Sequence, residues 1–184
     1  MPHSIAVLVG SLRKESHTRK IARAVERVTP GLAFTPIEIG ELALYNEDLD
    51  GSPPASWTTL RDALGKADGY LFATPEYNRS VPGVLKNAID VGSRPGGKSS
   101  FGSKKPAAII SVTPYSLGGF GANHHLRQAL SYLDLAVLAQ PEMYISNAGK
   151  LLDADGSFAN DDTKQLFTKF GAAFTAWVER HHAK

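Results

Sequence analysis

Short apolar runs that alternate with helical stripes of apolar residues constrain the fold of this chain more than any other feature. Residues 5–9, 69–74 and 107–112 are nearly continuous apolar segments, which is typical of strands buried on both faces of a sheet. Ile21, Val25 and Val28 recur at helical spacing after the first of these runs. Strands that alternate with helices predict an α/β fold built around a parallel sheet.

The rest of the chain continues the same alternation. Five predicted strands with interposed helices favour a doubly wound parallel sheet, whose ligand is expected beyond the carboxyl ends of the strands. The remaining predicted elements are a strand over 32–39, a helix lined by Trp57, Leu60 and Leu64, a helix over 84–89, a helix lined by Leu126, Ala129, Leu130 and Leu133, a strand over 136–138, and a closing helix lined by Leu166, Phe170, Ala173, Phe174 and Trp177.

Length and charge narrow the class of protein. A chain of 184 residues with 42% hydrophobic residues predicts one domain over residues 1–184 with a substantial core. The formal charge of +2, from 20 basic and 18 acidic residues, is far from the basic surface that nucleic-acid binding needs, so no nucleic-acid partner is expected.

The absence of cysteine excludes several kinds of chemistry. Disulfides, thiolate metal sites and cysteine nucleophiles cannot form, so redox activity would need a bound cofactor. The sequence also shows no signal peptide and no apolar run long enough to cross a bilayer, which predicts a cytoplasmic protein with no membrane partner.

The loop after the first strand, residues 10–18, has the composition of a phosphate site. Hydroxyl groups, a guanidinium group and the amides of a helix start can all donate hydrogen bonds to phosphate oxygens. An ordinary helix cap at Ser16 with a solvated Arg13 is the alternative. The loop matches neither GxGxxG nor the P-loop pattern. Its candidate ligands are Ser11, Arg13, Ser16, His17 and Thr18.

The loop after the third strand contains Pro75, Glu76, Tyr77 and Asn78, and it leads through Pro82-Gly83 into a helix. Two prolines restrict the backbone, so its polar groups can be held in fixed directions toward a planar ring. A proline-rigidified turn is the alternative.

The loop after the fourth strand is rich in glycine, which permits close approach of the backbone to a ligand, although a hinge or simple turn is the alternative. All three loops leave parallel strands at the same end of the sheet, so they converge in space. A phosphate site beside two ring-binding loops suits a mononucleotide with an aromatic head, such as FMN. The candidate residues of this third loop are Thr113, Pro114, Tyr115, Ser116, Gly118 and Gly119.

These segments resemble the NADPH-dependent FMN reductases of flavodoxin-like fold, which include quinone, chromate and azo-dye reductases. The resemblance covers nearly the whole chain. Its motifs are Gly10-Ser11-Leu12-Arg13 with Ser16, residues 75–90 (Pro-Glu-Tyr-Asn-x-Ser-x-Pro-Gly-x-Leu-Lys-Asn-Ala-Ile-Asp), and Gly118-Gly119 with Leu126-Arg127.

The resemblance implies a three-layer fold with sheet order 2-1-3-4-5, an FMN cofactor and NADPH or NADH as electron donor. Hydride would pass from nicotinamide to FMN and on to an acceptor such as a quinone, free flavin, azo dye or chromate by a ping-pong mechanism, without an obligatory catalytic side chain. The relatives assemble around the flavin, so a homodimer or homotetramer is expected.

Two positions depart from the pattern that the resemblance leads us to expect. Arg79 occupies a site where an aromatic residue is common, and Gly121 one where an arginine often follows the two glycines. We hypothesise that Arg79 reaches Glu142 near a subunit interface or the mouth of the site. Tyr115 stands where a smaller residue is expected, so the resemblance does not imply that this chain shares the substrate range of the family.

Two other kinds of protein share features of this sequence pattern. A flavodoxin-like electron carrier or flavin-binding partner without nicotinamide turnover is disfavoured by the near-neutral charge, and a low-molecular-weight tyrosine phosphatase by the absence of cysteine. The pairs His124-His125 and His181-His182 lack the i, i+4 spacing of two ligands on one helix face, so no metal site is predicted.

Overall fold

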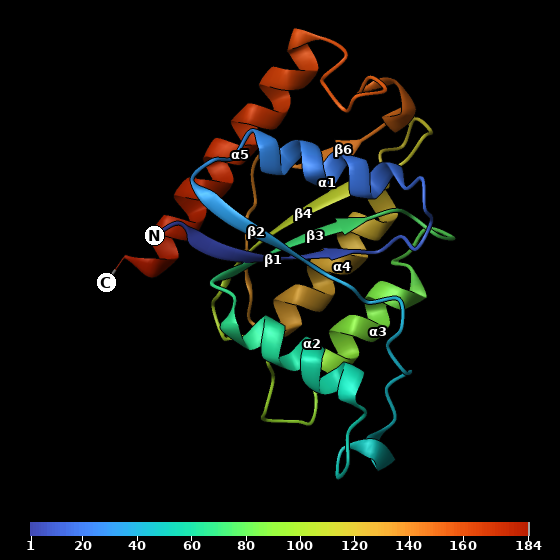
Figure 1. Ribbon diagram of the computed structural model, residues 1–184, viewed down its shortest axis with the longest axis vertical. Helices are drawn as coiled ribbons and strands as arrows, with labels where there is room; N and C mark the ends of the chain where they lie inside the picture. Colours follow the sequence, from blue (N-terminus) through green and yellow to red (C-terminus); the bar gives the residue numbers. More distant parts are fainter. Residues whose placement is uncertain (184) are drawn as a thin grey trace.

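A twisted parallel sheet runs through the middle of the molecule, and helices cover both of its faces (Figure 1). The computed structural model describes residues 1–183 of the chain. The strands are β1 (His3–Val9), β2 (Leu32–Ile37), β3 (Gly69–Thr74), β4 (Pro106–Val112), β5 (Ala136–Val137) and β6 (Met143–Ile145). The helices are α1 (His17–Arg27), α2 (Ala55–Lys66), α3 (Gly83–Gly92), α4 (Phe120–Tyr132) and α5 (Asp161–His182), with short 3-10 turns η1 (Glu47–Leu49) and η2 (Ala148–Lys150).

The sheet order is β2-β1-β3-β4-β5, which confirms the predicted order 2-1-3-4-5. Every pairing between these strands is parallel. All six residues of β3 and all seven of β4 are buried, as expected for central strands covered on both faces. The flavodoxin-like α/β architecture predicted from the sequence is therefore confirmed.

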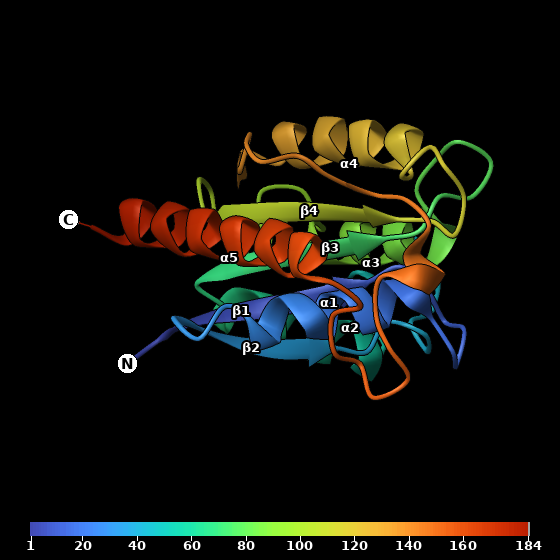
Figure 2. The ribbon, with the colours of Figure 1, turned by 90° about the horizontal axis from the view of Figure 1, so that it is seen from above.

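The sheet separates two hydrophobic clusters. Successive side chains of β1 point to opposite faces, so Ile5 and Val7 join one cluster while Ala6 and Leu8 join the other. Helices α1 and α5 cover the first cluster, and α2, α3 and α4 cover the second (Figures 1 and 2). The two clusters are thus divided by the backbone of the sheet.

The fifth strand differs from the prediction. The sequence indicated one strand over 136–138, whereas the edge beside β4 is filled by two short strands. β5 pairs with the beginning of β4, at Pro106 and Ala107, and β6 pairs with its end, from Ile110 to Val112. Pro141 lies between the two strands and has no N–H to donate to the ladder, which accounts for part of the interruption.

Side-chain caps fix the beginnings of the first and last helices. Ser16 Oγ accepts a hydrogen bond from the N–H of Arg19 at 3.2 Å, and Asn160 Oδ1 accepts one from the N–H of Thr163 at 2.8 Å. Asp161 and Asp162 stand in the first turn of α5, where the helix dipole favours negative charge. Ser16 is therefore the N-cap of α1, which leaves its hydroxyl hydrogen available to a ligand.

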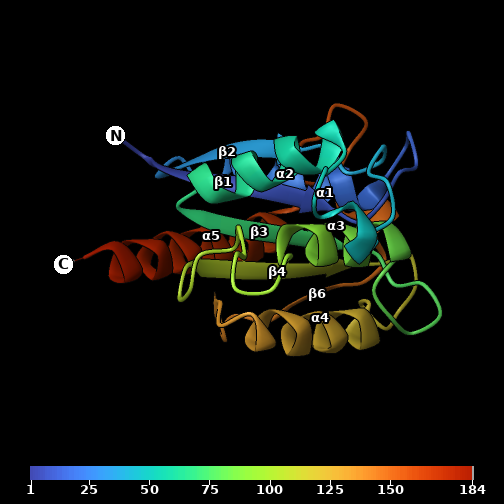
Figure 3. The same cartoon turned by 90° about the horizontal axis from the view of Figure 1, so that it is seen from below.

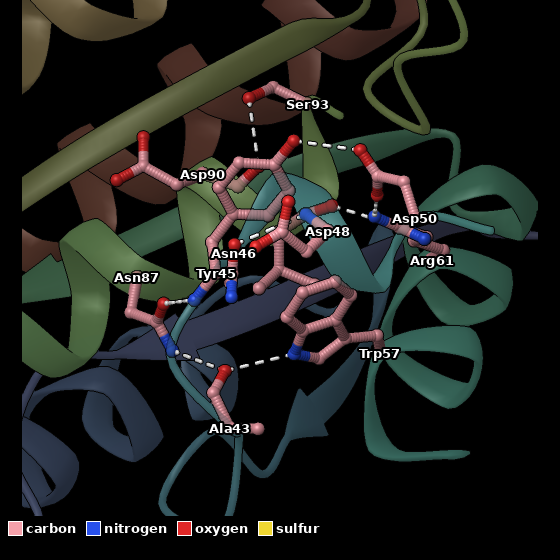
Figure 4. A network of polar contacts seen from close by, with 11 residues as sticks. Ala43, Tyr45, Asn46, Asp48, Asp50, Trp57, Arg61, Asn87, Asp90 and Ser93 are labelled. Carbon is pink, nitrogen blue, oxygen red and sulfur yellow. Dashed lines mark hydrogen bonds and ion pairs between the residues drawn. The ribbon is translucent and has the colours of Figure 1, made fainter. Parts of the chain in front are cut away.

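The segment between β2 and α2 contains η1 and is held against α2 and α3 (Figure 4). Asn87 Oδ1 accepts from the N–H of Tyr45 at 2.9 Å, and Asn87 Nδ2 donates to the carbonyl of Ala43 at 3.1 Å. The Tyr45 hydroxyl and Arg61 both donate to the carboxylate of Asp50 (Figure 4). Asn87 of the α3 motif thus has a structural partner in the segment after β2.

The carboxyl ends of β1, β3 and β4 point to one end of the molecule, and the two chain termini lie at the other (Figures 2 and 3). The loops that follow these three strands therefore gather at a single edge. No helix in the described part of the chain is long and apolar enough to span a membrane.

Candidate functional site

A cavity of about 530 Å³ opens at the carboxyl edge of the sheet. All three predicted loops contribute to it, and every predicted site residue except Gly118 lines it. The predicted residues around the cavity are Ser11, Arg13, Ser16, His17, Thr18, Pro75, Glu76, Tyr77, Asn78, Thr113, Pro114, Tyr115, Ser116 and Gly119. The strand topology has brought together residues that are distant in the sequence.

The loop after β1 presents hydrogen-bond donors at the start of α1. Ser11, Ser16 and Thr18 are buried, whereas Arg13 is exposed at the rim. Because Ser16 Oγ caps the helix as an acceptor, its hydroxyl hydrogen can still point to a ligand. The first N–H groups of a helix have no acceptor within the helix, so those of His17 and Thr18 add to the same set. This combination suits an anion.

The loop after β3 closes in a tight turn. The N–H of Tyr77 donates to the carbonyl of Ser80, and the N–H of Ser80 donates back to the carbonyl of Tyr77, both at 3.0 Å. Asn78 and Arg79 at the tip have positive φ values of 51° and 64°. A turn of this kind requires positive φ at both central residues, and asparagine tolerates it well. The tip is therefore fixed by its own backbone.

Glu76 braces this turn against α4. Its Oε1 accepts from Arg79 Nη1 at 3.2 Å and its Oε2 accepts from the N–H of Ala122 at 3.1 Å. The side chain of Arg79 is 71% exposed and that of Glu76 only 11%. The hypothesis that Arg79 reaches Glu142 is wrong within one chain, because Glu76 is nearer along the turn and takes the guanidinium. Glu142 instead accepts from the hydroxyl of Tyr144 at 2.8 Å.

A second contact fastens the same loop to α4. Ser80 Oγ lies 3.0 Å from His125 Nδ1, within hydrogen-bond distance. The sequence did not indicate this link between the loop and His125. Only the position of the histidines in the first turns after the glycine loop could have signalled it.

The two glycines after β4 are needed for different structural reasons. Gly118 has a φ of +61°, and a Cβ there would lie 2.6 Å from Cβ of Tyr144. Gly118 is therefore required by its contact with β6, and the expectation that it approaches a ligand is not supported by its position outside the cavity lining. Gly119, with a φ of +71°, caps α4 and does line the cavity.

A series of buried hydrogen bonds holds the loop that contains these glycines. Ser111 Oγ donates to the carbonyl of Gly118 at 2.6 Å, and Asn123 Nδ2 donates to Ser111 Oγ at 3.2 Å. Arg127 Nε in turn donates to Asn123 Oδ1 at 3.1 Å and its Nη1 to the carbonyl of Leu138. The Arg127 of the motif thus serves the shape of the loop and has no place in the cavity lining.

Tyr144 joins β6 to α4 beside this loop. Its hydroxyl hydrogen goes to Glu142, so the neighbouring His124 Nε2, at 3.0 Å, is the donor to the tyrosine oxygen. Partial burial and the Glu142 carboxylate raise the pKa of Tyr144 to about 12. Tyr144 is therefore a neutral hydrogen-bonding group at physiological pH.

Three residues line the cavity that were not among the predicted site residues: Arg79, Val112 and Leu117. Arg79 and Leu117 lie within the predicted loops, and Val112 is the last residue of β4, so their place in the sequence was the available signal. Val112 and Leu117 were not predicted, since a lone apolar residue has no distinctive chemistry. Arg79 was noted in the sequence, but it was assigned to Glu142 and not to the cavity lining.

Residues 3–150 match the family of NADPH-dependent FMN reductases. The chain belongs to this family. The chain is 50% identical to the quinone reductase of Pseudomonas putida strain KT2440 over 183 residues, which covers 98% of this chain and 97% of the relative. It is 42% identical to a 2-hydroxy-1,4-benzoquinone reductase of Burkholderia sp, with 97% of each chain covered.

A solved structure shows the same family fold. The flavoenzyme FerB of Paracoccus denitrificans, an NAD(P)H:(acceptor) oxidoreductase, superposes with a TM-score of 0.92 at 38% identity, over 97% of this chain and 98% of that chain. The resemblance to FMN reductases drawn from the sequence is thus confirmed.

The cavity fits the cofactor that membership of the FMN reductase family implies. Hydroxyl groups, helix-start amides and a guanidinium at one side form a donor set that matches a phosphate. A volume of about 530 Å³ lies within the range of small-molecule and cofactor sites. The loops after β3 and β4 provide backbone and aromatic groups at the other side, as a flat ring requires.

Proposed function

We propose that this protein is an FMN-dependent NAD(P)H oxidoreductase that reduces a small acceptor such as a quinone. The observation that carries the proposal is the convergence of a phosphate-type donor set and two ring-type loops on one cavity. Family membership supports the cofactor and the donor, and the 50% identical relative named quinone reductase supports the acceptor. Free flavin, azo dyes and chromate are further acceptors to test.

Each loop has a distinct task in this proposal. Ser11, Arg13, Ser16, His17 and Thr18 would hold the phosphate of FMN, while residues 75–78, 113–116 and Gly119 would hold the ribityl chain and the ring. When bound, FMN supplies the hydride-transfer and electron-transfer chemistry. The protein's own contribution is to bind, to orient and to leave one face of the ring accessible, so no catalytic acid or base is assigned.

Glu76 contributes to binding of the flavin ring indirectly, because it holds the backbone of the turn at residues 77–80 in place. Both of its carboxylate oxygens already accept hydrogen bonds within the chain. The N–H groups of Asn78 and Arg79, at the tip of the turn, are not used by the turn's own pair of hydrogen bonds. We assign the ring contact to this backbone, because a braced turn presents its donors without further ordering.

The rim of the cavity is suited to exchange of small molecules. Tyr77 and Tyr115 are 52% and 76% exposed, and Arg79, whose side chain is 71% exposed, lines the same cavity and offers a positive charge to an incoming nicotinamide nucleotide. Because one cavity would serve donor and acceptor, we expect them to bind in turn, which gives ping-pong kinetics.

The test is an anaerobic reduction followed by visible absorption. The protein is loaded with FMN, freed of excess, and mixed with NADPH or NADH. We expect retained flavin that bleaches within seconds and is reoxidised by a quinone. Flavin that stays oxidised with both nucleotides would favour an electron carrier, and failure to retain flavin would overturn the assignment of the three loops.

A matched pair of ligands tests the phosphate side separately. Riboflavin has the same ring as FMN and lacks the phosphate. If Arg13 and the start of α1 hold the phosphate, Arg13→Ala weakens FMN binding about tenfold or more and leaves riboflavin binding unchanged. An equal loss for both ligands would place Arg13 elsewhere.

Three other expectations stay proposals. We propose one flavodoxin-like FMN-binding domain over residues 1–184, a cytoplasmic location, and a homodimer or homotetramer. The apolar side chains of Leu117 and Phe120, each 56% exposed beside the cavity, support assembly at this face. Light scattering after gel filtration gives the mass in solution, and a monomer at micromolar concentration would contradict the last of these.

A further inference from the structure

Three potential metal ligands meet at the end of the sheet opposite the cavity. His3 begins β1, Asp68 immediately precedes β3, and His182 ends α5. Each offers one ligand atom, and these atoms all lie within 4.8 Å of one another. The marked N and C termini lie at this end of the molecule (Figure 2). The cluster could not be predicted from the sequence, because its members are brought together only by the folded chain.

The carboxylate of the cluster is held in place. Asp68 Oδ2 accepts hydrogen bonds from the N–H of Ser4 at 2.8 Å and from Ser4 Oγ at 3.0 Å. The N–H of Asp68 donates to the carbonyl of Ser4, also at 2.8 Å. All of these bonds use Oδ2 or the backbone, so Oδ1 keeps its capacity to bind a cation. A positioned carboxylate of this kind needs little ordering when an ion arrives.

The two imidazole rings lie against each other and beside this carboxylate. Their centroids are 4.6 Å apart, and His3 Nδ1 lies 3.8 Å from Asp68 Oδ2. His182 Nε2 lies 2.9 Å from the carbonyl of Asp68. A carbonyl can only accept, so Nε2 carries the hydrogen and Nδ1 is the basic nitrogen of the neutral ring. A metal-binding histidine commonly donates its other N–H to a carbonyl in this way.

The neighbouring cation does not compete for the carboxylate directly. Lys105 Nζ donates to the carbonyls of Ala67 and Gly65, at 2.6 Å and 3.0 Å. The side chains of His3 and Asp68 are 33% and 39% exposed, so an ion can enter from solvent and keep water as a further ligand. Two imidazoles and one carboxylate form a ligand set typical of zinc and related divalent ions, and unlike the all-oxygen sets of calcium and magnesium.

We propose that His3, Asp68 and His182 form a binding site for a divalent transition-metal ion, with Zn²⁺ as the ion that fits this ligand set. Zinc bonds of about 2.0–2.2 Å need the ligand atoms closer together than 4.8 Å. Rotations about the side-chain torsions of His3 and His182 supply this movement. Binding ties the end of α5 to the start of the sheet and leaves the distant cavity unchanged.

Zinc titration by calorimetry tests the site in tag-free, FMN-loaded protein cleared of metals with a chelator. We expect one equivalent of Zn²⁺ to bind with micromolar affinity, and no binding of Ca²⁺ or Mg²⁺. With zinc at about 100 times its Kd, the melting temperature should rise by about 5–10 °C. Quinone reduction by the holoenzyme should be the same with and without the metal.

Neighbouring histidines provide the matched control. His181 precedes His182 on the helix, but its Nδ1 is 2.8 Å from the carbonyl of Trp177 and it is outside the cluster. His3→Gln and His182→Gln should each weaken zinc binding at least tenfold, while His181→Gln should not. Absence of zinc binding to the unaltered protein would overturn the proposal, and so would an equal loss in the His181 and His182 variants.

Discussion

Glu76 Oε2 accepts a hydrogen bond from the N–H of Ala122 at 3.1 Å, which ties the loop after β3 to the first turn of α4. The other carboxylate oxygen holds Arg79 of the same loop. One side chain therefore fixes the relative position of two of the three loops that line the cavity. A shift of either loop would therefore displace any ring bound between them.

Removal of this carboxylate should weaken FMN binding. Glu76→Ala leaves the N–H of Ala122 without its acceptor and releases Arg79, so we expect the Kd for FMN to rise tenfold or more, as for loss of a charge-assisted hydrogen bond. Glu76→Gln keeps an acceptor oxygen and should recover most of the affinity. Quenching of flavin fluorescence measures both, and equal affinities in all three proteins would show that the brace is not needed.

Gly121 should not tolerate a side chain. A Cβ there would lie 2.5 Å from the carbonyl oxygen of Arg79 and 3.1 Å from Glu76 Oε2, so the loop would have to shift. We expect Gly121→Ala to lower the free energy of unfolding by about 1–3 kcal/mol and to weaken FMN binding. The departure from the arginine expected at this position thus has a steric cause in this chain.

A second glycine provides the control for that experiment. Gly65 lies within α2, and a Cβ there would meet nothing within 4 Å. Alanine has a higher helix propensity than glycine. Gly65→Ala should therefore raise the free energy of unfolding by about 0.5–1 kcal/mol and leave FMN binding unchanged. Urea unfolding of the two variants side by side separates the contact at Gly121 from a general effect of alanine.

Asn87 should contribute to stability through the segment after β2. Asn87→Ala leaves the N–H of Tyr45 without its acceptor in a partly buried place (Figure 4), which costs about 1–3 kcal/mol of unfolding free energy. The adjacent Lys86 forms an exposed pair with Asp90, so Lys86→Ala should change stability by less than about 1 kcal/mol. Similar losses in the two variants, measured by urea unfolding, would contradict a special role for the amide.

Tyr70 should make the fold sensitive to alkali. Its side chain is fully buried, and burial raises its pKa from 10.0 to about 12. A raised pKa means that the stabilising effect is complete below about pH 10 and is lost as the pH rises toward 12. We expect a loss of about 2–3 kcal/mol over this interval, from two pKa units at about 1.4 kcal/mol each.

Tyr70→Phe removes the ionisable group and should flatten this part of the stability profile, although it also loses the hydrogen bond to the carbonyl of Leu64. Tyr132→Phe alters a tyrosine that is 82% exposed and should leave the profile as it is. Urea unfolding at pH values from 9 to 12 gives the comparison. A profile for Tyr70→Phe that falls as steeply as that of the unaltered protein would exclude Tyr70 as the source.

The sequence predicted the parts of the structure that depend on local pattern. The apolar runs of β1, β3 and β4 and the cap at Ser16 follow from residues adjacent in the chain, and parallel topology then places the loops together. The division of the fifth strand was not predictable, because it depends on which half of β4 each short segment meets. The partner of Arg79 was also predicted wrongly, because it depends on the conformation of the turn. With positive φ values at Asn78 and Arg79, the guanidinium group pairs with Glu76.

Contacts made only by the folded chain account for the other differences. Gly118 is a glycine because of Tyr144, and the two residues are far apart in the sequence. Asn87 and His125 look like ordinary helical positions until their partners at Tyr45 and Ser80 are known. Sequence patterns for metal ligands describe residues within one helix or loop. They cannot identify His3, Asp68 and His182, which come from a strand, a loop and a helix that are far apart in the sequence.

The division of the apolar side chains by the sheet has a consequence for engineering. The buried residues beneath α1 and α5 form one hydrophobic cluster, and those beneath α2, α3 and α4 form another. Substitutions such as Phe170→Leu on one side and Leu60→Val on the other should therefore have additive effects on unfolding free energy, whereas pairs of contacting residues within one side should not. Improvements to the two halves of the interior can be selected in separate libraries and then combined in one chain.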